Sequence, residues 1–164
     1  MFFIRKATDK DYFRIMEIYR FAQDFMIASG NPDQWKHTHP KPELIHSDIE
    51  NGICYVICEE DVIHGVFAIQ TGIDPTYSYI ENGEWLNNDP YVTIHRIASD
   101  GTKRGIFFVA VDFCKTICSN IRVDTHKDNS PMLHQIEKAG FSRCGTIYLA
   151  NGSPRIAFQW TSTQ

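Results

Sequence analysis

The chain has 164 residues, of which 43% are hydrophobic, 13% aromatic and 22% charged, and its formal net charge is −4. This length suits one ordinary domain, and we predict a single domain over residues 1–164. The composition excludes a disordered chain, because it supplies enough apolar surface for a core. The negative charge disfavours nucleic acid as a partner, since binding to a polyphosphate needs a basic surface.

The chain also lacks the signals of membrane and secreted proteins. No apolar run approaches the roughly 18 residues that a membrane-spanning helix needs, so we expect no membrane partner. The first residues indicate a strand rather than a signal peptide, because Arg5 and Lys6 follow a short apolar run. Five cysteines, an odd number, lie in apolar segments. They favour core packing in a reducing compartment over disulfides or zinc, and we expect a cytoplasmic protein.

The charges are distributed unevenly along the sequence. Between Pro42 and His95 there are ten acidic residues and no Lys or Arg, whereas from Arg96 onward there are nine basic and five acidic residues, a balance of +4. Such polarity fits a protein that brings an anionic ligand together with a cationic one. Ordinary solvated surface is the alternative.

The first half of the chain predicts a strand, two helices and a hairpin. Residues 2–6 are a strand, and Thr8 with Asp11 forms a capping-box pattern at the start of a helix. Apolar residues then recur at helical spacing: Tyr12, Ile15, Met16, Tyr19, Ala22 and Met26. Gly30 and Pro32 end this helix. Residues 31–40 are a loop and 40–51 a shorter helix, and 53–58 and 62–70 are hairpin strands.

The second half begins with an irregular excursion over residues 71–90. Loops of this length are usually functional or disordered, and the aromatic residues Tyr77, Tyr79 and Trp85 argue against disorder. A strand over 91–98, a glycine-containing turn over 99–105 and an apolar, buried helix over 106–118 follow. We then predict a strand over 121–125, a helix over 130–140 that begins with Ser-Pro, and strands 141–149 and 155–160 around an Asn-Gly turn.

Two segments have patterns that point to chemistry. Residues 93–107 form a strand, a polar loop that contains Lys103 and Arg104, and the start of a helix. Free backbone N–H groups and the positive end of the helix dipole meet there, which is typical of an anion site, although a purely structural turn is the alternative. Residues 129–141 read Asn-Ser-Pro-Met-Leu-His-Gln-Ile-Glu-Lys-Ala-Gly-Phe.

Together these segments resemble the acetyl-CoA loop and the Asn-x-x-small-x-x-x-x-Glu-Lys-x-Gly-Phe helix of the GCN5-related N-acetyltransferase (GNAT) superfamily. The element order is similar along essentially the whole chain. The resemblance implies an α/β fold with a central mixed, mostly antiparallel sheet, flanked by helices and splayed between its fourth and fifth strands. It also implies acetyl-CoA as cosubstrate and N-acetyl transfer as the activity.

The resemblance assigns cofactor contacts to nine residues. In that family the fourth strand pairs with pantetheine, the turn after it holds the pyrophosphate, and an asparagine of the second motif commonly contacts the cofactor. The corresponding residues are Ile97, Ala98 and Ser99 for the strand, Lys103, Arg104, Gly105, Ile106 and Phe107 for the turn, and Asn129 for the asparagine.

The sequence departs from the family pattern at two positions. Phe107 replaces the last small residue of the loop pattern, which puts the close approach of a phosphate in question. Ile136 stands where the family often has the tyrosine that protonates the departing CoA thiolate, so the usual general acid is absent. Both departures support an alternative function, a degenerate member that binds CoA or another ligand without turnover.

Acetyl transfer to an amine needs a neutral nucleophile and a proton for the thiolate. His95 alternates with Thr93 and Ile97 on one face of the predicted strand and is our candidate for the base. Tyr148, near the end of the chain, is our candidate for the acid. A structural role in the strand or hairpin is the alternative for both.

The two irregular segments contain the candidates for the acceptor pocket, which are Trp35, Tyr79 and Trp85. Simple packing is the alternative for the two tryptophans. No metal is expected, because the loop histidines lack carboxylates or thiolates at ligand spacing.

The predicted function is therefore acetyl-CoA-dependent N-acetylation of a primary amine of a small molecule or peptide, by direct attack in a ternary complex. The identity of the acceptor and the oligomeric state, a homodimer included, stay open.

Overall fold

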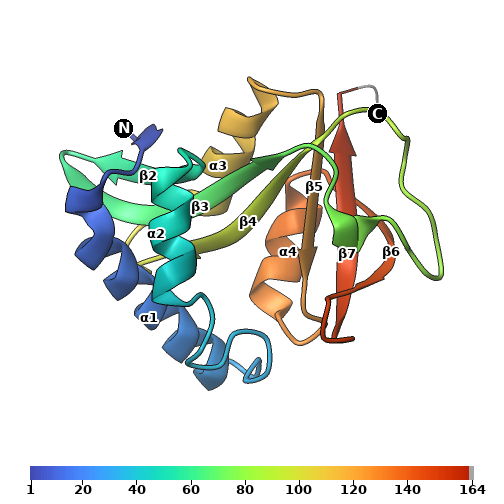
Figure 1. Cartoon of the computed structure of the whole chain (residues 1–164), viewed down its shortest axis with the longest axis horizontal. Coiled ribbons are helices and arrows are strands. Elements are labelled where there is room, and N and C mark those ends of the chain that lie inside the picture. Colours follow the sequence, from blue (N-terminus) through green and yellow to red (C-terminus); the bar gives the residue numbers. More distant parts are fainter. Residues whose placement is uncertain (163–164) are drawn as a thin grey trace. The chain divides into compact units, whose positions relative to one another are not determined.

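The strands of the chain form one seven-stranded sheet in the order β1-β2-β3-β4-β5-β7-β6 in the computed structural model, which describes residues 1–162 (Figure 1). Strands β4 and β5 are parallel, and the other registered pairs are antiparallel. The predicted α/β fold with a mixed, mostly antiparallel sheet flanked by helices is confirmed.

The chain divides into two compact units, the first made of residues 1–69 and 95–113 and the second of residues 70–94 and 114 onward. The single domain and the splay between β4 and β5 stay predictions.

The first unit contains the N-terminal elements and the segment around the predicted anion site. Its elements are β1 (Phe3–Lys6), the short 3-10 helix η1 (Asp9–Asp11), α1 (Tyr12–Ala28), α2 (Pro42–Glu50), β2 (Cys54–Glu59), most of β3 (Val62–Thr71), the second half of β4 (Val92–Ser99) and most of α3 (Ile106–Lys115). Helix α3 ends at Lys115 rather than at the predicted residue 118, because the Cys114 carbonyl accepts the N–H groups of both Ile117 and Cys118 in a closing turn.

Local chemistry explains where α1 begins and ends. The predicted capping box of Thr8 and Asp11 is present, with the Asp11 carboxylate accepting the Thr8 N–H at 2.8 Å, but it caps η1, the 3-10 helix that leads directly into α1. At the other end, the Ser29 N–H reaches the Phe25 carbonyl at 2.9 Å, and Gly30 follows with φ +92. Glycine adopts this left-handed conformation without the steric cost that a Cβ imposes.

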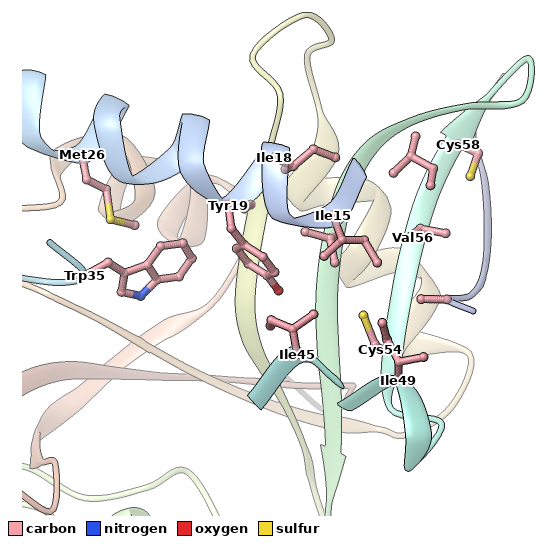
Figure 2. Packing of buried hydrophobic residues seen from close by; sticks show 14 residues of the cluster. Ile15, Ile18, Tyr19, Met26, Trp35, Ile45, Ile49, Cys54, Val56 and Cys58 are labelled. Carbon is pink, nitrogen blue, oxygen red and sulfur yellow. The ribbon is translucent and has the colours of Figure 1, made fainter. Parts of the chain in front are cut away.

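Helix α1 is held by its apolar face, which packs on β2 and α2 (Figure 2). Ile15 and Ile18 are fully buried and Tyr19 is 1% exposed. Burial of each such side chain contributes about 1.5–3 kcal/mol relative to exposure. Val56 of β2 and Ile45 of α2 complete this contact, so the core fixes α1 over the strands of the first unit.

The second unit contains the remaining elements, which are η2 (Pro75–Tyr77), the start of β4, β5 (Asn120–Thr125), α4 (Ser130–Lys138), β6 (Ser142–Tyr148) and β7 (Pro154–Thr161). The parallel pair β4 and β5 is in register at Val92 with Ile121. The β6–β7 hairpin closes where predicted, with the Leu149 N–H bonded to the Ser153 carbonyl at 2.9 Å and Gly152 at φ +85.

The irregular excursion over residues 71–90 is packed onto β6. Glu81 and Thr146 exchange two backbone hydrogen bonds of 2.9 and 2.8 Å in an isolated antiparallel bridge. A Cβ on Gly83 would lie 1.9 Å from the Cys144 carbonyl oxygen, so only glycine allows this approach. Tyr77 is buried and donates its hydroxyl to the Asp124 carboxylate at 2.7 Å. The excursion is therefore an ordered part of the second unit.

Membrane-spanning helices, metal-binding groups and reactive cysteines are three further features that the described residues could contain. Within residues 1–162, no helix is both long and apolar enough to cross a bilayer. The same part of the chain holds no group of three or more His, Cys, Asp or Glu residues arranged for a metal ion. All five cysteines are free thiols. Burial raises the pKa of Cys54 and of Cys114 to about 12, so both are protonated packing residues at neutral pH.

Candidate functional site

The turn that joins β4 to α3 has the geometry of an anion site. Gly105 precedes the helix with φ +82, and its carbonyl accepts the Val109 N–H at 3.0 Å. Apart from the two chain neighbours of Gly105, no atom of residues 1–162 lies within 4 Å of the position that a Cβ on this glycine would take. The first N–H groups of a helix have no carbonyl partner one turn earlier, and those of α3 follow directly on this open position. Hydrogen-bond donors, the helix dipole and free space thus meet at Gly105.

Most of the predicted cofactor-binding residues lie together in the first unit. They form the end of β4, the turn and the start of α3: Ile97, Ala98, Ser99, Lys103, Arg104, Gly105, Ile106 and Phe107. The side chains of the turn are exposed, whereas Ile106 and Phe107 are 5% and 3% exposed. The last two residues can therefore present only their backbone to an anion.

The Phe107 ring does not cover the exposed side of the turn. It lies inside the first unit and meets the Phe108 ring edge-on, with the ring centroids 6.1 Å apart. The bulky residue that departs from the family pattern is therefore accommodated by the core.

The two cations of the turn differ in their partners. Lys103 Nζ lies 2.8 Å from Glu59 Oε2. The hydrogen bond from Lys103, together with one from the N-terminal ammonium, lowers the pKa of Glu59 to about 2, so the carboxylate is charged across the physiological range. Arg104 is exposed and has no ion pair within residues 1–162. Contact of either side chain with an anionic ligand stays a prediction, and for Lys103 such a contact would compete with the Glu59 ion pair.

A polar cluster around Asp100, which no sequence pattern predicted, holds the residues of the turn in place. Asp100 Oδ1 accepts the Thr102 N–H at 3.0 Å, and its other oxygen lies 2.7 Å from Arg14 Nη2 and 3.0 Å from His64 Nδ1. Burial alone would raise the pKa of Asp100, but the hydrogen bonds from Thr102 and His64 outweigh it and lower that pKa. Asp-Gly-Thr is a recognisable turn signal. No local signal links Asp100 to His64 and Arg14, which are 36 and 86 residues away.

Strand β4 is irregular at Arg96, one residue before the predicted pantetheine segment. Arg96 has φ +52, a conformation that interrupts the pleat of a strand. Its guanidinium donates to both oxygens of Asp48, from Nε at 2.8 Å and from Nη2 at 3.0 Å. Its carbonyl accepts the Tyr19 hydroxyl at 2.8 Å. Side chains from α1 and α2 therefore hold the irregular residue in place.

Replacing Asp48 with alanine should destabilise the protein by about 3–5 kcal/mol, because the change leaves the Arg96 charge buried without its partner. Asp48 is only 3% exposed. The free energy of unfolding in urea measures this loss. Glu50→Ala on the exposed side of the same helix is the matched control and should change that free energy by less than about 0.5 kcal/mol. Equal losses in the two variants would show that the ion pair does not support the strand.

His95 is half-buried in β4. Because the pleat is interrupted at Arg96, the two-residue alternation connects Thr93 with His95 but does not continue regularly to Ile97. The shared face of His95 and Ile97 that the sequence analysis assumed is therefore not supported. The role of His95 as a base stays a prediction.

The remaining cofactor candidate, Asn129, lies in the second unit and caps α4. Its side-chain Oδ1 accepts the Met132 N–H at 3.2 Å. On the same helix, Ile136 is 1% exposed. Its side chain packs in the core at the position where the family often has a tyrosine.

The candidate acid Tyr148 forms a small exposed cluster with Glu81 and Tyr79. The Tyr148 hydroxyl donates a short hydrogen bond to Glu81 Oε2, which raises the pKa of Tyr148. The Tyr79 and Tyr148 rings are stacked with centroids 6.4 Å apart, and Tyr79 is 61% exposed. Tyr148 is thus protonated at neutral pH, and proton donation elsewhere requires it to leave Glu81. Its catalytic role stays a prediction.

The two candidate tryptophans have packing partners within their own units. Trp35 is 8% exposed and lies edge-on to Tyr19 in the core of the first unit, with ring centroids 5.9 Å apart (Figure 2). The Trp85 ring lies 4.0 Å from the guanidinium carbon of Arg122, which has Tyr91 on another side at the same distance. The cation on Trp85 is therefore the protein's own Arg122. These contacts agree with the packing alternative, and a pocket-lining role for either tryptophan stays a prediction.

Comparison with known proteins gives structural neighbours. Neither the protein-family models nor the curated proteins contain a match. A GNAT-family acetyltransferase from Streptococcus agalactiae 2603 shares 28% sequence identity and a TM-score of 0.90, over 99% of this chain and 96% of that chain. A GNAT-family acetyltransferase from Listeria monocytogenes 4b F2365 shares 21% identity and a TM-score of 0.72, over 98% and 94%. An agmatine N-acetyltransferase has 12% identity and a TM-score of 0.62, over 98% and 99%.

The mixed sheet and the glycine turn that begins α3 define a protein of the GNAT fold. With the similarity in sequence and structure to the streptococcal protein, the chain belongs to the GCN5-related N-acetyltransferase superfamily.

Proposed function

We propose that this protein is an acetyl-CoA-dependent N-acetyltransferase that acts on a primary amine of a small molecule or peptide. The observation that carries the proposal is the turn at Gly105, where an open left-handed glycine, the N-terminus of α3 and the exposed Arg104 coincide. Membership in the superfamily supports it, because the structural neighbours are named acetyltransferases.

The residues of the turn have the chemistry that a pyrophosphate needs. Backbone N–H groups at the start of α3 would donate to its oxygens, and the Arg104 guanidinium would add a charge-assisted, bidentate contact. The end of β4 would pair with the pantetheine arm through the backbone of Ile97 to Ser99. Burial of the Phe107 ring keeps the approach to the turn open.

The proposed reaction is direct attack by the amine in a ternary complex. The amine first loses its proton, and His95 is proposed as the base or as the group that positions a water for this step. The nitrogen lone pair then forms the C–N bond at the thioester carbonyl while the C–S bond breaks. The acylated nitrogen releases one proton to water and the departing thiolate takes up one proton, so the transfer leaves the total number of protons unchanged. Tyr148 is proposed as the donor of the proton to the thiolate.

The acidic excursion is proposed to attract the amine as an ammonium ion. Its carboxylates are Asp74, Glu81, Glu84 and Asp89, and it contains no Lys or Arg. Tyr79 offers an exposed ring next to the Glu81 cluster, and a cation over such a ring gains about 0.5–2 kcal/mol. Of the three acceptor-pocket candidates, Tyr79 is therefore the one proposed to stack on the ammonium ion.

Changing both Glu81 and Glu84 to glutamine should raise KM for the amine and leave KM for acetyl-CoA unchanged. In the wild type, KM for the amine should rise with ionic strength, because salt screens exposed charges over roughly 8–10 Å. Steady-state kinetics at low and high salt measure both effects. The matched control is Glu43→Gln with Glu50→Gln, two exposed acids of α2. If the two double variants behave alike, the excursion is only a solvated face.

The alternative is a degenerate member that binds CoA or another ligand without turnover. It is favoured by Ile136, whose side chain offers no acid and is buried in the core. Release of free thiol from acetyl-CoA across a panel of primary amines separates the two functions. Amine-dependent release supports the transferase. Binding of acetyl-CoA by calorimetry with no release for any amine supports the degenerate member.

The cellular setting and partners follow from the sequence. An odd number of cysteines in apolar segments favours a reducing, cytoplasmic compartment, and the acidic net charge favours small amines over nucleic acid. We propose the cytoplasm as the site of the reaction, with acetyl-CoA and the amine as the only ligands required and a monomer or homodimer as the working form.

A further inference from the structure

The solvent-facing side of α1 carries three exposed phenylalanine side chains, more aromatic surface than is usual on the outer face of a helix. Its exposed residues recur at helical spacing: Phe13, Glu17, Arg20, Phe21, Asp24, Phe25 and Ala28. The outer face of such a helix is normally polar. Here Phe13, Phe21 and Phe25 are 81%, 44% and 51% exposed, and contiguous exposed apolar surface usually marks a binding site.

Two of these rings form a pair that lies against the candidate anion turn. Phe21 and Phe25 have ring centroids 6.5 Å apart and planes only 19° from parallel. A Cβ on Gly101, in the turn, would lie 2.6 Å from the Phe21 Cζ atom. The tip of the Phe21 ring therefore contacts the backbone of the turn, and glycine at 101, with φ +78, is what makes this contact sterically allowed.

The chemistry of the cofactor indicates what such a pair would bind. In CoA, a single ribose joins the adenine to the pyrophosphate, so a base whose pyrophosphate lies on the turn has to settle on a surface close to it. Flat aromatic rings bind a base by stacking on its face, and this contact does not depend on the hydrogen-bond donors and acceptors of the base. Near-parallel rings beside the turn match this requirement, and the exposed Arg104 of the same turn favours an anionic nucleotide.

We propose that Phe21 and Phe25 form an adenine platform, the binding site for the base of acetyl-CoA. The inference rests on the proposed function, because it takes the ligand of the turn to be acetyl-CoA. It adds a nucleotide-recognition role for the solvent-facing side of α1.

The test compares two ligands in two proteins. Acetyl-CoA contains the adenosine part, and acetyl-4′-phosphopantetheine lacks it. The Phe21→Ala/Phe25→Ala variant should bind acetyl-CoA about 5- to 100-fold more weakly than the wild type, the fold-change expected for the loss of one stacked base. Its affinity for acetyl-4′-phosphopantetheine should not change. Calorimetry measures both, and circular dichroism checks the fold of the variant.

Two further variants and one measurement on the wild type sharpen the result. Phe13→Ala, on the same helix but away from the pair, should bind acetyl-CoA normally. Phe21→Tyr/Phe25→Tyr keeps both ring faces and should retain wild-type affinity. In saturation-transfer NMR of the wild type, the adenine protons should receive saturation more strongly than the pantetheine methyl protons.

The outcomes that would overturn the proposal are distinct. Unchanged acetyl-CoA affinity in the alanine variant rejects the platform while the proposed function stands. An equal loss for both ligands shows that the turn was disturbed, which also rejects it. A wild type that binds no acetyl-CoA rejects the proposed function and the platform together. Analytical ultracentrifugation tests one more outcome. If the wild type is a dimer and the alanine variant is a monomer, the two rings form an interface with a second copy of the chain, and the platform is rejected.

Discussion

Replacing Gly105 with glutamate should weaken acetyl-CoA binding by roughly tenfold to several thousandfold, the range expected when one or two charge-assisted hydrogen bonds are lost at about 1.5–3 kcal/mol each. The open position beside Gly105 lets the new side chain fit without a steric clash. Its carboxylate would then lie at the N-terminus of α3, where it repels a phosphate and competes for the same N–H groups. Calorimetric titration of the folded variant with acetyl-CoA measures the effect.

The matched control for this experiment is Gly72→Glu. Gly72 has φ +81 against +82 for Gly105, and beyond the chain neighbours of each glycine no atom in the described part of the chain lies within 4 Å of either Cβ position. Both variants therefore impose the same backbone strain and add the same charge, but only Gly105 precedes a helix of ten residues. Gly72→Glu should bind acetyl-CoA like the wild type. Wild-type affinity in Gly105→Glu would show that the turn is not the cofactor site.

Replacing His95 with alanine should lower kcat by about 10²- to 10⁴-fold, the usual contribution of a positioned general base, while acetyl-CoA affinity stays close to that of the wild type. The reason is that a base acts on the amine, whereas the cofactor is held by backbone groups of the turn and the strand. His95→Gln keeps a polar side chain of similar length but cannot accept a proton near neutral pH, and it should lose a similar share of kcat.

Two controls separate catalysis from structure in this test. His134→Ala changes an exposed histidine of α4 and should leave kcat unchanged. The pH profile of kcat supplies the second control, because removal of a base should abolish the limb of the profile that the base produces. A variant that turns over at the wild-type rate at every pH would leave His95 with a structural role only. A drop in kcat matched by a drop in unfolding free energy would point the same way.

The sequence and the structure agree best where a signal is local. The helical spacing of apolar residues in α1, the capping pair Thr8 and Asp11, and the Asn-Gly turn of the last hairpin each act through residues within a few positions of one another. Helix propagation, capping and tight turns depend on just such neighbours. The same holds for the turn over residues 99–105, which its glycines and its place between a strand and an apolar helix predicted; the left-handed φ of Gly105 was added by the structure.

By itself the sequence therefore determined the order of the elements, the α/β class and the position of the candidate anion turn. Only the tertiary structure decided how single side chains are used. It buried Phe107 and Trp35, paired Trp85 with Arg122, bound Asp100 to residues 36 and 86 positions away, and gave Arg96 its irregular conformation. A buried polar group must find a partner wherever the fold supplies one, and an aromatic ring packs against whichever neighbour reaches it. The partner of a buried polar group and the neighbour of an aromatic ring therefore cannot be predicted from the residues next to them in the sequence.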